Sequence, residues 1–445
     1  MAAPRYKQLV GEFAQNIRSG AWRAGTRLVT HRELARKHGI ALATATKVYA
    51  ELEALGLVSG ETGRGTYVRD LNVPPGYGQL PERQLQRHGV VDLAFNYPYD
   101  TRQADALRKA LRTLTAQGDL ASLGMLISAQ PTVGRELERC TVAQHLQARG
   151  IQAQAADLIL VNGAQQGLAL TVLALLKPGD VVAVDALTYP GFIALAQTHS
   201  LDLAPIAMGS HGPNLSDLER LMRSRPVKAI YTMPTLHNPM GWVMSRAARE
   251  RLAALAHQHD ALIIEDGSYA FLMADAPTPV RELAPERTVY VSGLSKALGG
   301  GVRFGFVVSP PRYVQALERT LRALTWSNST LITALCGRWL EDGTVQQMEQ
   351  EKRDDATVRQ QIASEELADL HMIRNPASYF VWLMLPSDMR ADQLAATLMR
   401  QGVLVATSEA FAAAPSFPHA VRLSLGGCDL TTLRTALQRI RREIG

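Results

Sequence analysis

Cysteine, long apolar runs and a leader pattern are scarce or absent in this sequence of 445 residues. Its three cysteines show no CxxC spacing, which argues against a disulfide framework and against a metal site. The longest apolar run, residues 168–176, is much shorter than the ~20 residues that span a bilayer. No apolar segment follows Arg5, Lys7 and Glu12, so we expect no signal peptide, no membrane partner and a cytoplasmic location.

The charge of the chain is concentrated at one end. Hydrophobic residues make up 47% and charged residues 20% of the chain, which is typical of folded domains, and the length predicts two or three of them. Residues 1–70 contain eleven Lys or Arg and six Asp or Glu, so this segment carries five of the six net positive charges. A basic head on a nearly neutral body indicates a polyanionic partner for the head alone.

The head, residues 1–69, shows a pattern of three helices and a hairpin. Apolar spacing predicts helices at 6–19, 32–38 and 43–55, and alternation around glycines predicts short strands at 57–58 and 66–68. Thr30 and Glu33 have the spacing of a capping box that opens the second helix. Two helices with a tight turn followed by a hairpin are typical of a winged helix-turn-helix that reads DNA. A helical protein-interaction domain with a solvated basic face is the alternative.

The segment RELARKHGIALATATKVYAELEALGLVSGETGRGTYV resembles the winged helix of GntR-family repressors. The resemblance implies binding to a double-stranded DNA operator. Leu42 stands where an Arg usually opens the recognition helix, which favours apolar contact with thymine methyl groups. The positions that match the DNA-contacting residues of the family are Arg32, Thr44, Thr46, Lys47, Arg64 and Gly65.

The remainder of the chain is expected to be a linker and an α/β body. Residues 70–89 are rich in proline and glycine, as linkers are. From residue 90 to 445, strand-like and helix-like segments alternate, which predicts a mostly parallel sheet with its site at the carboxyl ends of the strands. We expect a large lobe at about 100–335 and a small α+β lobe at about 336–445. The expected strands of the large lobe are 158–161, 181–184, 229–232, 261–265, 288–291 and 304–308.

Two charged residues at predicted strand ends suggest a cofactor site. Lys296, in SGLSKALGGGVRFG, could form a Schiff base with an aldehyde cofactor, although an isolated lysine of this kind is more often a surface residue. A serine–lysine nucleophile pair would need serine at position 293, where Gly293 stands. Asp266 ends the segment ALIIED, where it could face a pyridinium nitrogen or cap a helix.

Further segments supply groups that a phosphorylated aromatic cofactor needs. Ser295 and Arg303 could hold a phosphate together with the helix start in NGAQQGL. Tyr189 offers a flat face for ring stacking, and Asn238 and Tyr269 could donate hydrogen bonds to a phenolate oxygen. Arg422, in VRLSL, could bind a carboxylate.

These ordered landmarks resemble a fold-type I aminotransferase over residues 91–445, which implies pyridoxal 5′-phosphate as the cofactor. Two departures stand out: Gly293 replaces a Ser or Thr of the phosphate cup, and ISAQPTVG lacks the tyrosine that reaches the partner's cofactor in many transaminases. The resemblance implies Lys296 as the Schiff-base lysine and Arg422 as the clamp for a carboxylate. It implies a cofactor-binding set of Ala164, Gln165, Tyr189, Asn238, Asp266, Tyr269, Ser295, Lys296 and Arg303.

The fusion of the two domains resembles the MocR subfamily of GntR-type regulators. It implies a homodimeric transcription regulator that senses a small amine or amino acid through the Lys296 aldimine, without physiological turnover. Such a regulator could retain a residual half-reaction of the aminotransferase type. Two alternatives stay open: a catalytically active aminotransferase whose DNA-binding head is autoregulatory or vestigial, and a DNA-binding protein whose body only dimerises.

The carry-over of Arg64 to the wing predicts a phosphate contact. Arg64→Ala should weaken operator binding and lower the slope of log K against log salt by about one, because one fewer counterion is released. Binding titrations at several salt concentrations measure this slope. An unchanged slope would argue against the role.

Overall fold

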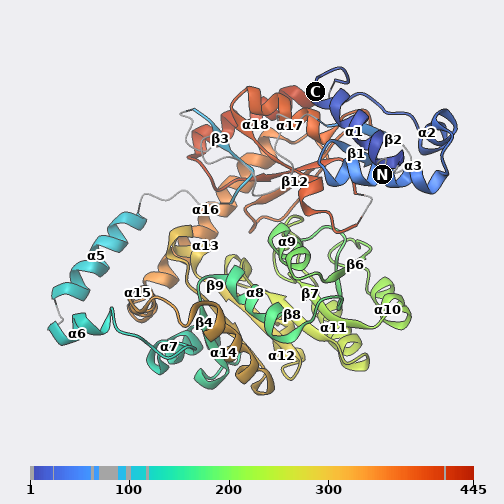
Figure 1. Cartoon of the computed structure of the whole chain (residues 1–445). Helices are drawn as coiled ribbons and strands as arrows, with labels where there is room; N and C mark the ends of the chain where they lie inside the picture. The colour runs from blue at the N-terminus through green and yellow to red at the C-terminus, as the bar shows by residue number, and fades with distance from the viewer. Residues whose placement is uncertain are drawn as a thin grey trace.

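The computed structural model describes residues 5–23, 25–61, 65–69, 89–96, 102–116, 120–414 and 417–445. A winged-helix head, blue in Figure 1, lies beside a small lobe drawn in red, and a large lobe built on a seven-stranded sheet lies below them. Arg64 and residues 70–88 of the expected linker fall outside the described residues. The expected domain boundaries therefore remain a prediction.

The head is folded around a core to which its three helices and the wing all contribute. Leu9, Leu34, Val48 and Leu52 are at most 1% exposed. The helices begin and end within one residue of the expected positions, and the first strand runs further, to Glu61. The elements are α1 (Arg5–Arg18), α2 (His31–His38), α3 (Leu42–Ala54), β1 (Val58–Glu61) and β2 (Gly65–Val68), with β1 and β2 antiparallel.

The large lobe contains a sheet with the order β4-β10-β9-β8-β7-β5-β6, in which β10 is antiparallel to both of its neighbours and the other pairs are parallel. Six strands lie where the sequence predicts them; the edge strand β6 was not expected, because exposed Asp202 and half-buried Pro205 interrupt its apolar pattern. The bounds are β4 (Leu158–Val161), β5 (Val181–Asp185), β6 (Asp202–Ile206), β7 (Val227–Thr232), β8 (Leu262–Asp266), β9 (Thr288–Gly293) and β10 (Gly305–Val308).

Helices cover both faces of this sheet, as a parallel sheet requires. Val182 and Val184 share one core with α8 and α14, whereas Val181 and Ala183 share another with α10 and α11. In Figure 1, α5 and α6 extend away from the body. The helices are α5 (Gln103–Ala116), α6 (Leu120–Met125), α7 (Glu136–Gln147), α8 (Ala164–Leu175), α9 (Pro190–Thr198), α10 (Leu215–Ser224), α11 (Arg246–Gln258), α12 (Val280–Leu283), α13 (Ser295–Leu298), α14 (Pro311–Thr325) and α15 (Thr330–Glu341), with 3-10 turns η1 (Ala155–Asp157), η2 (Ala270–Leu272) and η3 (Gly300–Val302).

The small lobe follows the long helix α16 (Thr344–Glu366) and contains an antiparallel sheet with the order β11-β12-β15-β14. A short strand from the start of the body, β3 (Val91–Asp92), pairs with β13 (Val403–Leu404), so residues 89–96 lie with the small lobe. Within the described ranges, no helix is long and apolar enough to cross a membrane. The other elements are β11 (Met372–Arg374), β12 (Phe380–Met384), α17 (Ala391–Arg400), β14 (Ala406–Thr407), η4 (Ser408–Phe411), β15 (Ala420–Ser424) and α18 (Leu430–Ile444).

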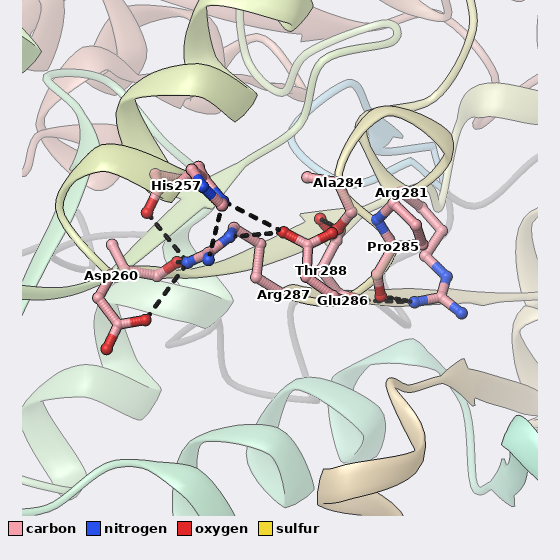
Figure 2. A network of polar contacts seen from close by, with 10 residues as sticks. His257, Asp260, Arg281, Ala284, Pro285, Glu286, Arg287 and Thr288 are labelled. Carbon is pink, nitrogen blue, oxygen red and sulfur yellow. Dashed lines mark hydrogen bonds and ion pairs between the residues drawn. The ribbon is translucent and has the colours of Figure 1, made fainter.

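Two buried arginines, Arg281 and Arg287, lie at the end of the sheet where β8 and β9 begin (Figure 2). The Arg287 guanidinium donates to the carbonyls of Ala256 and Ala261 and lies 3.2 Å from His257 Nδ1. Arg281 donates to the carbonyl of Thr288 at 3.2 Å. These contacts hold the starts of both strands. The carboxyl ends of the strands lie at the opposite end of the sheet, where they build a site.

The expected capping box of α2 is present. Thr30 Oγ1 accepts a hydrogen bond from the Glu33 amide at 3.2 Å, and Glu33 Oε2 accepts one from the Thr30 amide at 2.8 Å. These hydrogen bonds lower the pKa of Glu33. They satisfy amides that would otherwise lack partners at the start of the helix.

Removing this cap should loosen α2. Thr30→Ala should lower the local opening free energy by about 1 kcal/mol, which is about fivefold faster amide exchange in α2. Hydrogen exchange followed by mass spectrometry measures this change in the full chain. Ser19→Ala, which removes an exposed hydroxyl of the head, is the control, and equal exchange in both variants would contradict the cap's contribution.

Candidate functional site

A cavity of about 190 Å³ lies where β8 and β9 end and α8 begins. It brings together predicted residues from five separate segments of the chain. Phe95, Asn96, Met233 and Ser268 also line it, and no sequence pattern pointed to them. The predicted cofactor residues that line it are Ala164, Gln165, Tyr189, Asp266, Tyr269, Ser295, Lys296 and Arg303.

Lys296 lies in α13, one short turn after β9. Its Nζ donates a hydrogen bond to the Asn96 carbonyl at 2.9 Å and lies 5.7 Å from the centre of the Tyr269 ring. The Tyr269 hydroxyl is 3.5 Å from Asn96 Nδ2. The amine is therefore held at the cavity wall by a segment two hundred residues away in the chain.

Asp266 ends β8 and is 2% exposed. Its Oδ2 accepts a hydrogen bond from the Tyr231 hydroxyl at 3.0 Å, and its Oδ1 accepts one from the Ser268 amide at 2.9 Å. Burial raises the pKa of Asp266, while these hydrogen bonds and the charge of Lys296 oppose the shift. A buried carboxylate of this kind gains stability from a cationic partner.

Glycine residues surround the start of α8, where the backbone segments lie too close together for side chains. A Cβ on Gly305 would lie 2.6 Å from the Gly163 carbonyl carbon, and one on Gly293 would lie 2.7 Å from the Phe304 carbonyl oxygen. The glycine at 293 is therefore a steric requirement, and serine would not fit there without movement. Beside this cradle, Ser295 Oγ is buried and has no hydrogen-bond partner among the described residues.

Arg303 and Tyr189 border the same cradle. Arg303 has a left-handed backbone, with φ 47°, and donates to the Asn162 carbonyl at 3.2 Å. A Cβ on Gly191 would lie about 2.5 Å from the Tyr189 ring, so only glycine allows the ring to fold over this turn. Gln165 Nε2 donates to the Gly191 carbonyl at 3.1 Å and links the turn to α8.

Asn238 and Arg422 form a separate, buried pair. Arg422 Nη1 donates to Asn238 Oδ1 at 3.0 Å, and Nη2 donates to the Ala94 carbonyl. The guanidinium is 4.8 Å from the ring centre of Phe380 and 4.9 Å from that of Phe411. Neither residue of the pair is among those that line the cavity. The amide oxygen of Asn238 thus faces the predicted carboxylate clamp.

The predicted DNA-contacting residues of the head differ in their exposure to solvent and in the groups that they contact. Arg32, Thr46 and Lys47 are exposed and Thr44 is half-buried. Thr46 Oγ1 is 3.2 Å from His31 Nδ1, and Lys47 Nζ is 4.2 Å from the Tyr6 ring centre. Leu42 is 49% exposed at the start of α3, which is unusual for leucine and suits contact with an apolar group. Gly65 opens β2, and Arg64 is outside the described residues.

The sequence reasoning missed Asn96 and Tyr231. Asn96 holds Lys296, but it follows a two-residue strand, and no spacing links it to a lysine two hundred positions later. Tyr231 reads as a core residue, and its ring stacks on Phe192 with centres 3.8 Å apart. Its hydroxyl points at a carboxylate only because β7 and β8 are neighbours.

A larger cavity, of about 300 Å³, lies on another side of Asp266. His145, Arg149, Glu349 and Arg353 line it, and burial lowers the pKa of His145 to about 3. Asp266 is the one predicted site residue in its wall. We therefore assign the chemistry to the smaller cavity, which contains the lysine.

Two family models match the chain. The model for aminotransferase class I and II matches residues 89–440, and the model for bacterial regulatory proteins of the gntR family matches residues 5–68. The chain therefore belongs to the aminotransferase class I and II family, which implies pyridoxal 5′-phosphate as its cofactor. With a GntR-type DNA-binding head, it is a transcription regulator of MocR-like architecture.

Both transcription regulators and aminotransferases are among the known proteins that are similar to this chain. It is 27% identical to the uncharacterized HTH-type transcriptional regulator YdeF of Bacillus subtilis over 95% of this chain and 90% of that protein. It is 24% identical to YjiR of Escherichia coli, another uncharacterized HTH-type regulator, over 98% of both. The structure of a multiple substrate aminotransferase from Thermococcus profundus has a TM-score of 0.74 at 23% identity, over 81% of this chain and 93% of that one.

The cavity fits this cofactor. The glycine cradle, the unpartnered Ser295 hydroxyl and Arg303 suit a phosphate, which accepts hydrogen bonds from backbone amides, hydroxyls and guanidinium groups. The buried carboxylate of Asp266 suits a protonated ring nitrogen, and the amine of Lys296 suits an aldehyde.

The buried Asp266 predicts a pH dependence of the cofactor-free chain. Its folded pKa is raised, so the folded chain binds this proton more tightly than the unfolded chain, and stability falls as the pH rises through that raised value from the ordinary range near 4. Asp266→Asn should lose less stability over this rise. Urea denaturation between about pH 4.5 and 7.5 tests it, with exposed Asp388→Asn as the control. Equal slopes in the variant and the wild type would contradict the prediction.

Proposed function

We propose that this transcription regulator binds a small amine or amino acid at pyridoxal phosphate and changes its DNA binding in response, in the cytoplasm. The observation that carries the proposal is the shared cavity of Lys296 and Asp266, in a chain that also has a GntR-type head. When bound, the cofactor supplies an aldehyde that reacts reversibly with primary amines.

The residues of this chain would divide the work of recognition. Lys296 would hold the aldehyde end, Asp266 would pair with the ring nitrogen, and Ser295 and Arg303 would hold the phosphate. Tyr189 would offer its ring for stacking. Tyr269 would donate a hydrogen bond at the ring oxygen. Asn238 would do so only through its Nδ2 group, since its Oδ1 accepts from Arg422. Ala164 and Gln165 would lie at the phosphate. Arg422 would bind a ligand carboxylate through its guanidinium fork, which donates to Asn238 and to the Ala94 carbonyl in this structure and would have to exchange those partners for the ligand.

The head would present its exposed basic residues to an operator. Arg32, Thr44, Thr46, Lys47, Arg64 and Gly65 are the proposed contacts. An effector can alter operator affinity only if it binds two arrangements of the protein unequally.

An exposed apolar surface supports a homodimer. Ile127 is 89%, Leu137 69% and Trp326 63% exposed. Ile127 and Trp326 lie on two segments that touch, since Thr330 Oγ1 donates to the Ser128 carbonyl at 2.9 Å. Leu137 lies on α7, which packs against α15. Large apolar side chains that stay exposed on adjoining segments are typical of a protein interface. We propose that a second copy of the chain covers these side chains.

A catalytically active aminotransferase is the second candidate. The site contains both an amine at the cavity wall and a buried acid, which are the groups that a transaminase uses. Purified protein with pyridoxal phosphate, an amino acid and a keto acid distinguishes the two. Sustained turnover at about 1 per second or more would favour the enzyme.

The covalent role of Lys296 gives a direct test. Lys296→Ala should abolish the visible absorbance of protein incubated with pyridoxal phosphate and dialysed. Arg422→Met, which preserves volume in the core, should retain this absorbance but lose the spectral response to amino acids, by tenfold or more in apparent affinity, because a charge-assisted pair is lost. A retained band in Lys296→Ala would overturn the sensor proposal. A retained response in Arg422→Met would show that the effector is not held by its carboxylate.

The proposed dimer face predicts a change of mass. Trp326→Asp buries a charge at the interface and should shift the chain from dimer to monomer in light scattering after gel filtration. Val358→Asp, on an exposed apolar position of α16, is the control. A dimer that persists in Trp326→Asp at low micromolar concentration would place the interface elsewhere.

A further inference from the structure

The head of this chain makes specific polar contacts with the small lobe. Arg69, directly after β2, pairs with Glu409 in η4, with Nη1 2.9 Å from Oε1. The side chain of Arg69 is 11% exposed and that of Glu409 is 34% exposed. The ion pair is therefore partly shielded from water, and it is stronger than a fully solvated surface pair.

Arg390, just before α17, binds the wing. Its guanidinium lies 4.3 Å from the ring centre of Tyr67, and its Nη2 donates to Ser59 Oγ at 3.1 Å. Ser59 and Tyr67 are cross-strand partners in the hairpin, so one arginine contacts both strands of the wing. Asp392 holds the guanidinium at 3.0 Å. The small lobe thus has a formed surface for the wing.

The turn η4 connects this surface to the proposed ligand site. Glu409 and Phe411 are two residues apart in the same short turn. Phe411 stacks on Arg422, and its carbonyl accepts a hydrogen bond from the Thr188 amide at 2.8 Å, next to Tyr189. Arg422 and the segment beside the stacking tyrosine therefore both contact the turn that holds Arg69.

We propose that Arg390, Asp392 and Glu409 form a docking surface for the winged helix of the same chain, and that η4 transmits occupancy of the cofactor cavity to it. This inference rests on the proposed function. Arg32, Thr46 and Lys47 stay exposed in the docked head. Docking therefore orients the DNA-reading face without covering those residues, and its release would free the head to turn.

Hydrogen exchange of the full chain, with and without added pyridoxal phosphate, tests the coupling. In the wild type, the cofactor should slow exchange at 187–189 and 408–412, and also in the head at 57–61 and 65–69, by at least twofold. Arg390→Met should retain the first effect and lose the second. Arg400→Met, an exposed arginine of α17, is the matched control and should behave as the wild type.

The outcomes separate the two proposals. Two outcomes would overturn the coupling and leave the cofactor site intact. In the first, the cofactor slows exchange around the cavity of the wild type but not in its head. In the second, it slows exchange in the head equally in the wild type and in Arg390→Met. No slowing around the cavity in the wild type would overturn the sensor proposal, and the coupling with it. Should Arg390→Met unfold, the double variant Tyr67→Leu and Ser59→Ala removes the ring contact and the hydrogen bond from the head side and must give the same loss.

Discussion

The structure depends on two adjacent parallel strands that end at the same edge of a sheet. β8 and β9 pair in register, with Asp266 opposite Val291, so the chain leaves both strands at one place. Asp266 is the last residue of its strand, and Lys296 lies in the helical turn that follows the other. Arg281 and Arg287 bind carbonyl groups at the starts of these strands, Thr288 and Ala261 (Figure 2). A carboxylate and an amine are thereby directed to one cavity.

A second constraint is the fully buried Arg422, which joins three distant segments. It reaches from β15 of the small lobe to Asn238 of the large lobe and to the Ala94 carbonyl. Burying a guanidinium is costly unless hydrogen bonds and aromatic faces offset the loss of water. Phe380 and Phe411 supply those faces. The arrangement links the two lobes, and through η4 it also reaches the surface on which the head lies.

Several parts of this protein were predictable because the signals are local. The capping box at Thr30 and the glycines after each helix set the helices of the head to within one residue. Buried strands of the large lobe are continuous apolar runs and were found for the same reason. The edge strand β6 has no such run, since Asp202 is exposed and Leu203 and Pro205 are half-buried, and it was missed. The Lys296 and Asp266 segments were recognisable because strand ends and small residues surround them.

What the sequence alone determined is the elements of the head, the buried strands of the large lobe, the split between a basic head and a neutral body, and the chemical groups available to a cofactor. Those follow from short-range periodicity and from residue type. Only the tertiary structure decided that Asn96 holds Lys296, that Tyr231 holds Asp266, that Asn238 faces Arg422, and that the wing rests on Arg390. Each of these contacts joins residues far apart in the chain, and which distant segments meet is set by strand order and packing, which no local pattern records.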